Sequence, residues 1–140
     1  MRALLTAEPA LSPEQARLLS PLQLAYVGDS VHALLARTNL MEKNLPVRDM
    51  HAAANRAVSA VSQSREAKSI LPLLTEDETD VFRRGRNAHP HHAGPKSASA
   101  GEYAGATGLE ALLGYLYLTG QTDRLCFLAE RLQAEENENA

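Results

Sequence analysis

Hydrophobic residues recur in several segments of this chain every three or four positions, the spacing of one face of a helix. The longest such segment runs from Pro21 to about Leu40, and we expect it to form one helix. Its buried stripe is expected to consist of Val27, Val31 and Leu34 or Leu35. Asp29 interrupts this apolar segment, and small residues one turn away from it leave room for a close neighbour.

Paired start signals predict the first two helices. Ser12 and Ser20 are each followed by Pro and then, three positions after the Ser, by Gln15 and Gln23. Ser caps a helix N-terminus, Pro suits the first helical position, and Gln can complete a capping box. We therefore expect a short helix that ends near Leu19, followed at once by the long one.

Two helical segments are predicted in the middle of the chain. One helix is expected from about Val47 to Ser64, and a shorter piece from Ser64 to Leu71, because Pro72 interrupts the helical pattern there. The buried side of the first of these helices is expected to hold Ala52, Ala53, Ala57, Val58 and Val61.

A capping box predicts the start of the next helix. Thr75 and Glu78 have the spacing of such a box, and acidic residues fill the first turn. Val81 and Phe82 are expected to point inward. Gly85 is expected to end this helix, since glycine often follows the last helical turn.

The last two helices have different patterns. The segment from Glu102 to about Gly120 is apolar nearly all round and carries one carboxylate, Glu110, among small residues such as Gly114. A buried helix is therefore expected there. The segment from Gln121 to about Ala134 is amphipathic and is expected to be the final helix.

Together these patterns predict an all-α protein of about six to seven helices. No alternation of strands and helices and no glycine-rich phosphate loop is present in the sequence. A length of 140 residues favours one domain. Residues 1–11 and 134–140 are expected to be frayed ends, and residues 85–101 a mobile basic loop.

Composition narrows the class of protein. The chain is 44% hydrophobic and only 4% aromatic, so its core is built largely from Leu, Val and Ala. The single cysteine, Cys126, excludes an internal disulfide framework and fits a reducing compartment. No run of about 18 apolar residues is present, so we expect no membrane span. A cytoplasmic protein is the expectation that follows.

Positive charge is concentrated in one stretch of the chain. The formal net charge is −3, which argues against a nucleic-acid-binding surface over the whole molecule. Residues 83–101 nevertheless contain Arg83, Arg84, Arg86 and Lys96 and no acidic residue. Arginine suits the forked binding of phosphate, so contact with phosphate is expected here. The alternative is a solvated connection between helices.

Histidines and tyrosines offer weaker candidates. His89, His91 and His92 suggest zinc, but they are neighbours in one loop and Cys126 is distant, so a solvated loop is favoured. His32 lies one turn from Asp29, and a packing role is favoured for it over a contact that supports the site. The remaining aromatic candidates are expected in the core or at an interface: Tyr26, Tyr115 and Tyr117.

The two carboxylates within apolar segments are the strongest candidates for chemistry. Acidic residues are rarely buried unless a partner or a metal neutralises them. If Asp29 and Glu110 meet across neighbouring helices, they can hold Mg²⁺, or Mn²⁺ in its place, because such cations prefer oxygen ligands. Such an ion can activate water for phosphodiester cleavage. The alternative is that both acids are ordinary hydrogen-bonded polar residues.

These residues resemble the motifs of the ribonuclease III family. Residues 24–31, which include Gly28 and Asp29, resemble the family signature, and residues 107–114, which include Glu110, resemble its second acidic motif. The closer resemblance is to the Mini-ribonuclease III subfamily. It extends to residues 58–60 (Val-Ser-Ala) and 83–88 (Arg-Arg-Gly-Arg-Asn-Ala), so that it covers about residues 20 to 133.

The resemblance implies an all-helical endonuclease domain, without a double-stranded-RNA-binding domain, that cleaves double-stranded RNA with Mg²⁺. It implies that Asp29 and Glu110 are the catalytic and metal-binding residues. It also implies a homodimer, products with 5′-phosphate and 3′-hydroxyl ends, and a role in maturation of 23S ribosomal RNA beside the large ribosomal subunit. The residues expected to contact RNA are Arg83, Arg84, Arg86, Asn87 and Lys96.

Two departures from the wider family accompany this resemblance. Full-length ribonuclease III enzymes have Glu where this chain has Ala25, and Asp where it has Thr107. Both changes fit the Mini subfamily. The family's middle acidic position falls near Val47, so no role is transferred to Asp49.

Two non-catalytic functions are the alternatives. The missing carboxylates at positions 25 and 107 give some support to a helical RNA-binding or ribosome-associated factor. A purely structural helical dimer is a remoter alternative, since it has no use for the basic segment.

Overall fold

The structure, a computed structural model, describes residues 6–88 and 98–138, and its regular elements in these ranges are all helices. Its elements are α1 (Pro13–Leu18), α2 (Pro21–Leu40), η2 (Met41–Lys43), α3 (Val47–Ala57), α4 (Ala60–Ile70), η3 (Leu71–Leu73), α5 (Glu76–Ala88), α6 (Ala100–Leu118) and α7 (Thr122–Glu138). The seven α-helices of the described ranges confirm the predicted fold class.

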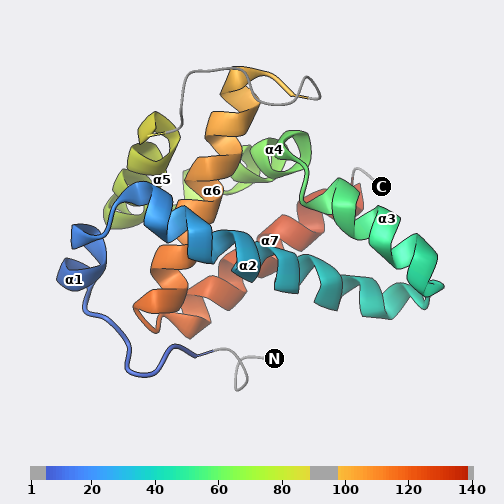
Figure 1. The fold of residues 1–140 in the computed structure, drawn as a ribbon, viewed down its shortest axis with the longest axis horizontal. Helices are drawn as coiled ribbons and strands as arrows, with labels where there is room; N and C mark the ends of the chain where they lie inside the picture. Colours follow the sequence, from blue (N-terminus) through green and yellow to red (C-terminus); the bar gives the residue numbers. More distant parts are fainter. Residues whose placement is uncertain (1–5, 89–97, 139–140) are drawn as a thin grey trace.

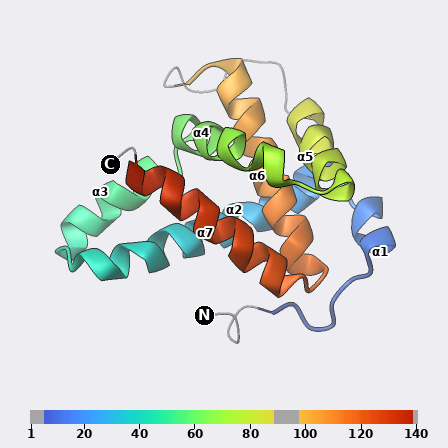
Figure 2. The same ribbon diagram turned by 180° about the vertical axis from the view of Figure 1, so that it is seen from behind.

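Helix α6 is the centre of the molecule. It packs against α2, α4, α5 and α7, so that α2 crosses one side of it and α7 the opposite side (Figures 1 and 2). Leu109, Leu112, Leu113 and Leu116 of α6 are fully buried. The buried helix predicted from about residue 102 onward is therefore confirmed.

Capping hydrogen bonds fix where the helices begin. Ser12, Ser20 and Ser99 form capping boxes at the starts of α1, α2 and α6. Thr75 and Glu78 exchange the same pair of bonds at the start of α5. The boxes predicted at Ser12, Ser20 and Thr75 are therefore confirmed.

The boundary between α3 and α4 was predicted wrongly. We expected a helix that continues to Ser64, whereas α3 ends at Ala57 and α4 begins at Ala60. The reason is a cap: the Ser59 hydroxyl accepts a hydrogen bond from the backbone N–H of Ser62 and starts a new helix in another direction. Consequently Val61, expected on the buried side, is exposed.

The expected buried residues of α2 and α3 were only partly right. Val31 and Leu35 are buried as predicted, whereas Leu34 is exposed. Ala52 of α3 is exposed, and Ala54 takes the buried place.

Three segment ends also differ from expectation. Helix α5 continues through Gly85 to Ala88, and α7 continues to Glu138, so both helices are longer than predicted. The backbone N–H of Leu11 donates to the carbonyl oxygen of Leu118 over 2.8 Å, which ties the first described residues to the end of α6.

The end of α6 agrees with prediction, because Gly120 follows it with a positive φ of 69°.

The expected mobile loop and frayed ends are only partly covered by the described ranges. Residues 85–88 and 100–101 of the expected loop belong to α5 and α6, and residues 89–97 lie outside the described part. None of the helices described is long and apolar enough to cross a bilayer.

Candidate active site

Two glycines allow α2 and α6 to touch through their backbones. A Cβ atom placed on Gly28 would lie 1.6 Å from the carbonyl oxygen of Glu110, and one placed on Gly114 would lie 2.0 Å from the carbonyl oxygen of Leu24. No side chain fits at either position without moving a helix. The two helices therefore cross at the shortest separation that backbone atoms permit.

This crossing brings the two candidate acids together. Asp29 follows Gly28 on α2, and Glu110 contributes its own carbonyl to the contact on α6. Burial, together with a hydrogen bond and charge repulsion from the Asp29 carboxyl, raises the pKa of Glu110 to about 8, while the Gln63 amide lowers it. The carboxyls of Asp29 and Glu110 thus lie within hydrogen-bonding reach, although 81 residues separate them in the sequence.

The pair is open on one side. Asp29 is exposed, whereas Glu110 is partly buried between α2 and α4. A ligand can therefore reach the pair from solvent on the Asp29 side. Asp29 lies at the edge of the buried face of α2, next to Gly28 and one turn from Ala25 and His32, which are buried.

The chemistry of this pair fits a divalent cation. Repulsion between two adjacent carboxylates keeps one of them protonated near neutral pH. A cation that prefers oxygen ligands would offset this repulsion and let both carboxyls ionise. Within the described ranges no group of three or more His, Cys, Asp or Glu side chains is placed to hold a metal. A cation at this pair would thus take most of its remaining ligands from water or substrate, as Mg²⁺ commonly does.

Polar side chains buried beside the pair were missed from the sequence. Gln63 of α4 is 2% exposed and lies beside Glu110. One turn further along α4, Oε2 of Glu66 lies 3.2 Å from Nε2 of His32, and both side chains are buried. The packing role favoured for His32 agrees with this burial. Extending the buried stripe of Ala67 and Ile70 back by one turn would have indicated Gln63 and Glu66.

The predicted RNA-contacting residues lie at the end of α5, with one exception. Gly85 packs against α6, where a Cβ placed on it would lie 2.7 Å from Cβ of Ala111, so this end of α5 adjoins the segment that carries Glu110. Arg86 and Asn87 are exposed there, and Arg84 is partly buried. Lys96 lies outside the described residues.

Arg83 differs from its two neighbouring arginines. Its guanidinium donates to the Asp80 carboxylate over 2.7 Å, and Asp80 also pairs with Arg17 of α1. Arg83 is therefore held by an acidic partner. Among the residues that the structure describes, Arg84 and Arg86 have no such acidic partner.

The remaining candidates do not join the pair. Asp49 is half exposed, and its nearest charged partner is its neighbour Arg48 at 3.8 Å. Tyr26 is 84% exposed, whereas Tyr115 is buried, so only the latter is a core residue as expected. The hydroxyl of Thr107 donates to a backbone carbonyl of its own helix. The histidines at 89, 91 and 92 lie outside the described ranges.

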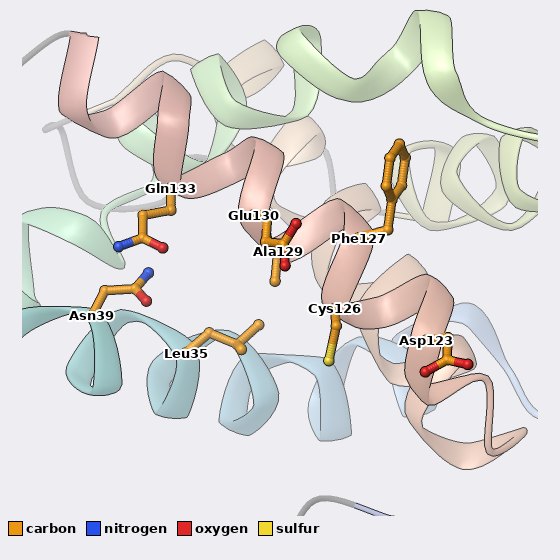
Figure 3. Close-up of a pocket in the computed structure, with 8 residues that line it drawn as sticks. All are labelled: Leu35, Asn39, Asp123, Cys126, Phe127, Ala129, Glu130 and Gln133. Carbon is orange, nitrogen blue, oxygen red and sulfur yellow. The ribbon is translucent and has the colours of Figure 1, made fainter. Parts of the chain in front are cut away.

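A separate groove lies between α2 and α7. Its volume is about 500 Å³, and its walls include Leu35 and Asn39 of α2 and Cys126 and Glu130 of α7 (Figure 3). Neither Asp29 nor Glu110 lines it. The groove therefore does not contribute to the carboxylate pair.

Comparison with known proteins gives one consistent result. Residues 22–121 match the family described as the ribonuclease III domain. The chain is 50% identical over 117 residues to the Mini-ribonuclease 3 of Symbiobacterium thermophilum, which covers 83% of this chain and 87% of that protein. It is 46% identical over 123 residues to the Mini-ribonuclease 3 of a Thermoanaerobacter species, with coverages of 87% and 82%.

A solved structure is similar as well. A crystal structure of a Fusobacterium nucleatum protein superimposes with a TM-score of 0.75 at 26% identity, over 84% of this chain and 93% of that one. The matched family segment includes the glycine crossing and both acids. The chain thus belongs to the ribonuclease III family, and it is an endoribonuclease.

Proposed function

We propose that this endoribonuclease cleaves double-stranded RNA with a divalent cation, Mg²⁺ or in its place Mn²⁺, held by Asp29 and Glu110. The observation that carries the proposal is the convergence of these two carboxyls at the Gly28–Gly114 crossing. Structural carboxylates are normally neutralised by basic partners. Here each carboxyl has the other carboxyl as its neighbour, which is an arrangement that favours the binding of a cation.

The two residues have different parts in the proposed reaction. Glu110, partly buried, gives up its proton when the cation binds, and Asp29 supplies the second negative charge at the open side. When bound, the cation supplies an acidified water and a positive charge for the phosphodiester. The attacking water oxygen bonds to phosphorus and gives up a proton to solvent, the bond from phosphorus to the 3′-oxygen breaks, and that oxygen takes up a proton from solvent. The products then carry 5′-phosphate and 3′-hydroxyl ends.

The exposed end of α5 is proposed to hold the RNA backbone. Arg84, Arg86 and Asn87 flank the point at which Gly85 packs on α6, the helix that carries Glu110, so phosphates bound there would lie next to that helix. Lys96 is proposed to join them. Arg83 would do so only by exchanging its Asp80 partner for a phosphate. Recognition of this kind follows duplex shape and charge, and it weakens as salt rises.

A homodimer is proposed around the start of α2. Leu22 and Tyr26 are one turn apart on this helix and are 45% and 84% exposed, and Leu18 at the end of α1 is 88% exposed. Large apolar side chains gathered at a surface commonly mark a protein contact. Asp29 is one turn beyond Tyr26, so a second copy seated here would bring two carboxylate pairs to one side of the dimer.

The substrate proposed is the precursor of 23S ribosomal RNA, in a cytoplasmic setting close to the large ribosomal subunit. The support for this choice is the resemblance of four separate motifs to the Mini-ribonuclease III subfamily.

The test is cleavage by the purified protein of a long RNA duplex and of 23S precursor RNA, with Mg²⁺ or with chelator. Metal-dependent shortening is expected, and sequencing of the product ends is expected to show defined sites with 5′-phosphates. Asp29→Asn and Glu110→Gln are each expected to lower kcat by at least about 10³-fold, because each removes half of the cation's protein ligands.

A matched control is Glu42→Gln. Glu42 is an exposed carboxylate in η2, at the far end of α2 from the proposed dimer contact, and this variant is expected to cleave normally. Full turnover by Asp29→Asn, with its folding verified by circular dichroism, would remove the carboxylate pair from the mechanism.

A further inference from the structure

A buried amide faces the proposed catalytic pair from a third helix. Gln63 of α4 is 2% exposed, and it lies close enough to the Glu110 carboxyl to lower the pKa of that carboxyl. Within the described part of the chain, its Nε2 has no hydrogen-bond partner. A buried N–H group without a partner destabilises the folded state, so its retention at this place calls for a reason.

The fold holds this amide in a fixed place. Ser59 caps the first turn of α4, and Ser64, the residue after Gln63, packs tightly on α6, where a Cβ on Gly105 would lie 2.8 Å from the Ser64 Oγ. One turn further on, the buried pair of Glu66 and His32 links α4 to α2. Gln63 is thus anchored to both helices that carry the acids.

A donor in this position can serve a carboxylate but not a cation directly. The Nε2 group of Gln63 carries two N–H donors and no lone pair for a metal. The Glu110 carboxyl, whose pKa Gln63 lowers, is an acceptor close to this amide. A carboxylate that binds a cation through one oxygen can accept a hydrogen bond on the other. Outer partners of this kind orient metal ligands in other proteins.

We propose that Gln63 is a positioning residue that donates from Nε2 to one oxygen of the Glu110 carboxylate and directs the other toward a cation at Asp29. This inference rests on the proposed function, since it assigns Gln63 a part in the same site. Gln63 touches neither RNA nor the reacting atoms, and it acts through Glu110 alone.

The test replaces Gln63 by Met, which has similar length and no donor. Binding of Mn²⁺ in the absence of RNA, followed by electron paramagnetic resonance, is expected to weaken about tenfold or more. Cleavage is expected to show a lower kcat with an unchanged KM for RNA, and excess Mg²⁺ is expected to restore part of it. Unchanged Mn²⁺ affinity and kcat in a folded Gln63→Met protein would overturn the inference.

Two further variants keep the result interpretable. Lys68→Met, on the exposed side of the same helix, is the matched control and is expected to bind Mn²⁺ and cleave like the parent. If Gln63→Met fails to fold, Gln63→Glu replaces it, because it keeps the size but has no donor when ionised. Its added negative charge attracts the cation and offsets the lost donor, so this variant is expected to keep Mn²⁺ binding but to lose kcat; parental kcat would overturn the inference.

The proposed function itself has a different outcome pattern. If Asp29→Asn binds Mn²⁺ and cleaves like the parent, the carboxylate pair fails as the site, whatever Gln63 does. If Asp29→Asn loses Mn²⁺ binding and cleavage while Gln63→Met retains both activities, the carboxylate pair remains the proposed site and only the positioning inference fails.

Discussion

Gly28 and Gly114 occupy each other's side-chain space. A Cβ on Gly28 would lie 2.9 Å from the backbone nitrogen of Gly114, and a Cβ on Gly114 would lie 3.0 Å from the backbone nitrogen of Gly28. The contact is reciprocal, so neither helix can carry a side chain at this point. Because Asp29 is next to one glycine and Glu110 is one turn before the other, the same contact sets the spacing of the acids.

Gly28→Ala and Gly114→Ala are therefore expected to be strongly destabilising. Each added methyl group meets backbone atoms of the opposite helix, which cannot move aside as a flexible side chain can. The free energy of unfolding is expected to fall by about 3 kcal/mol or more, measured by urea denaturation.

Gly101→Ala is the control for this pair of variants. Gly101 lies in the first turn of α6, the helix of Gly114. A Cβ there would have its nearest neighbour, the Ser99 Oγ, at 3.9 Å. With no clash and a better helix former, this variant is expected to be as stable as the parent, or up to about 1 kcal/mol more stable. Equal stability of all three variants would contradict the backbone contact.

The raised pKa of Glu110 predicts how stability depends on pH in the metal-free protein. The folded-state pKa is about 8 against an ordinary value of 4.5, so the folded chain holds a proton that the unfolded chain has lost between these values. The stabilising effect of that proton is fully present below pH 4.5, declines as pH rises above it, and is lost once pH passes 8. Melting temperature in chelator is therefore expected to decrease from pH 6 to pH 9.

Glu110→Gln should remove this part of the pH dependence. The neutral amide cannot ionise, so at pH 8.5 the variant is expected to melt at least about 3 °C above the parent, measured by scanning calorimetry in chelator. A parent and a variant with parallel melting curves from pH 6 to pH 9 would show that Glu110 does not titrate in this range.

Replacement of Arg86 tests the phosphate contact at the end of α5. In an Asp29→Asn background, which binds without cleaving, Arg86→Ala is expected to weaken duplex RNA binding by roughly three- to tenfold. The slope of log affinity against log salt is expected to fall by about one, the value of a single lost phosphate contact. Fluorescence anisotropy over a salt series measures both quantities.

Arg131→Ala is the matched control for Arg86. Arg131 is an exposed arginine of α7 that lies 5.2 Å from the ring centre of Phe127. Its removal changes the net charge by the same amount but is expected to leave the salt slope unchanged. If both variants lose the same affinity, the effect belongs to overall charge and not to the end of α5.

Tyr26→Lys tests the proposed dimer. A charged side chain at this exposed apolar position would be costly to desolvate in a contact, so the variant is expected to be monomeric by light scattering. Met41→Lys is the control, since Met41 is an exposed apolar residue too, at 58% exposure, but lies beyond the other end of α2. An equally dimeric Tyr26→Lys protein would move the contact to another face.

Local signals predicted much of this fold because they act within a few residues. The capping boxes at Ser12, Ser20 and Thr75 each need only one turn of chain, and each is present. The convergence of Asp29 and Glu110 could also be predicted, because small residues beside each acid suggested close packing and the motifs agreed.

Features that depend on a distant partner were not predicted. Gly85 has the pattern of a helix end, yet α5 continues through it because the missing side chain is needed for contact with Ala111. Ser59 is an exception, because its cap on α4 is a local contact with Ser62 that the sequence analysis missed. The helical spacing of Ala67 and Ile70 could have indicated that Gln63 is buried, but not what it lies beside, since Glu110 is 47 residues away and on another helix.

The placement of the two acids has a consequence for which substitutions this enzyme can tolerate without loss of its fold. Glu110 belongs to the helix around which the chain folds, whereas Asp29 is exposed on a helix that could vary there without disturbing the interior. Random mutagenesis should therefore recover catalytically dead but well-expressed proteins with changes at position 29. Changes at the fully buried leucines of α6, which are Leu109, Leu112, Leu113 and Leu116, should mostly be found in proteins that never accumulate.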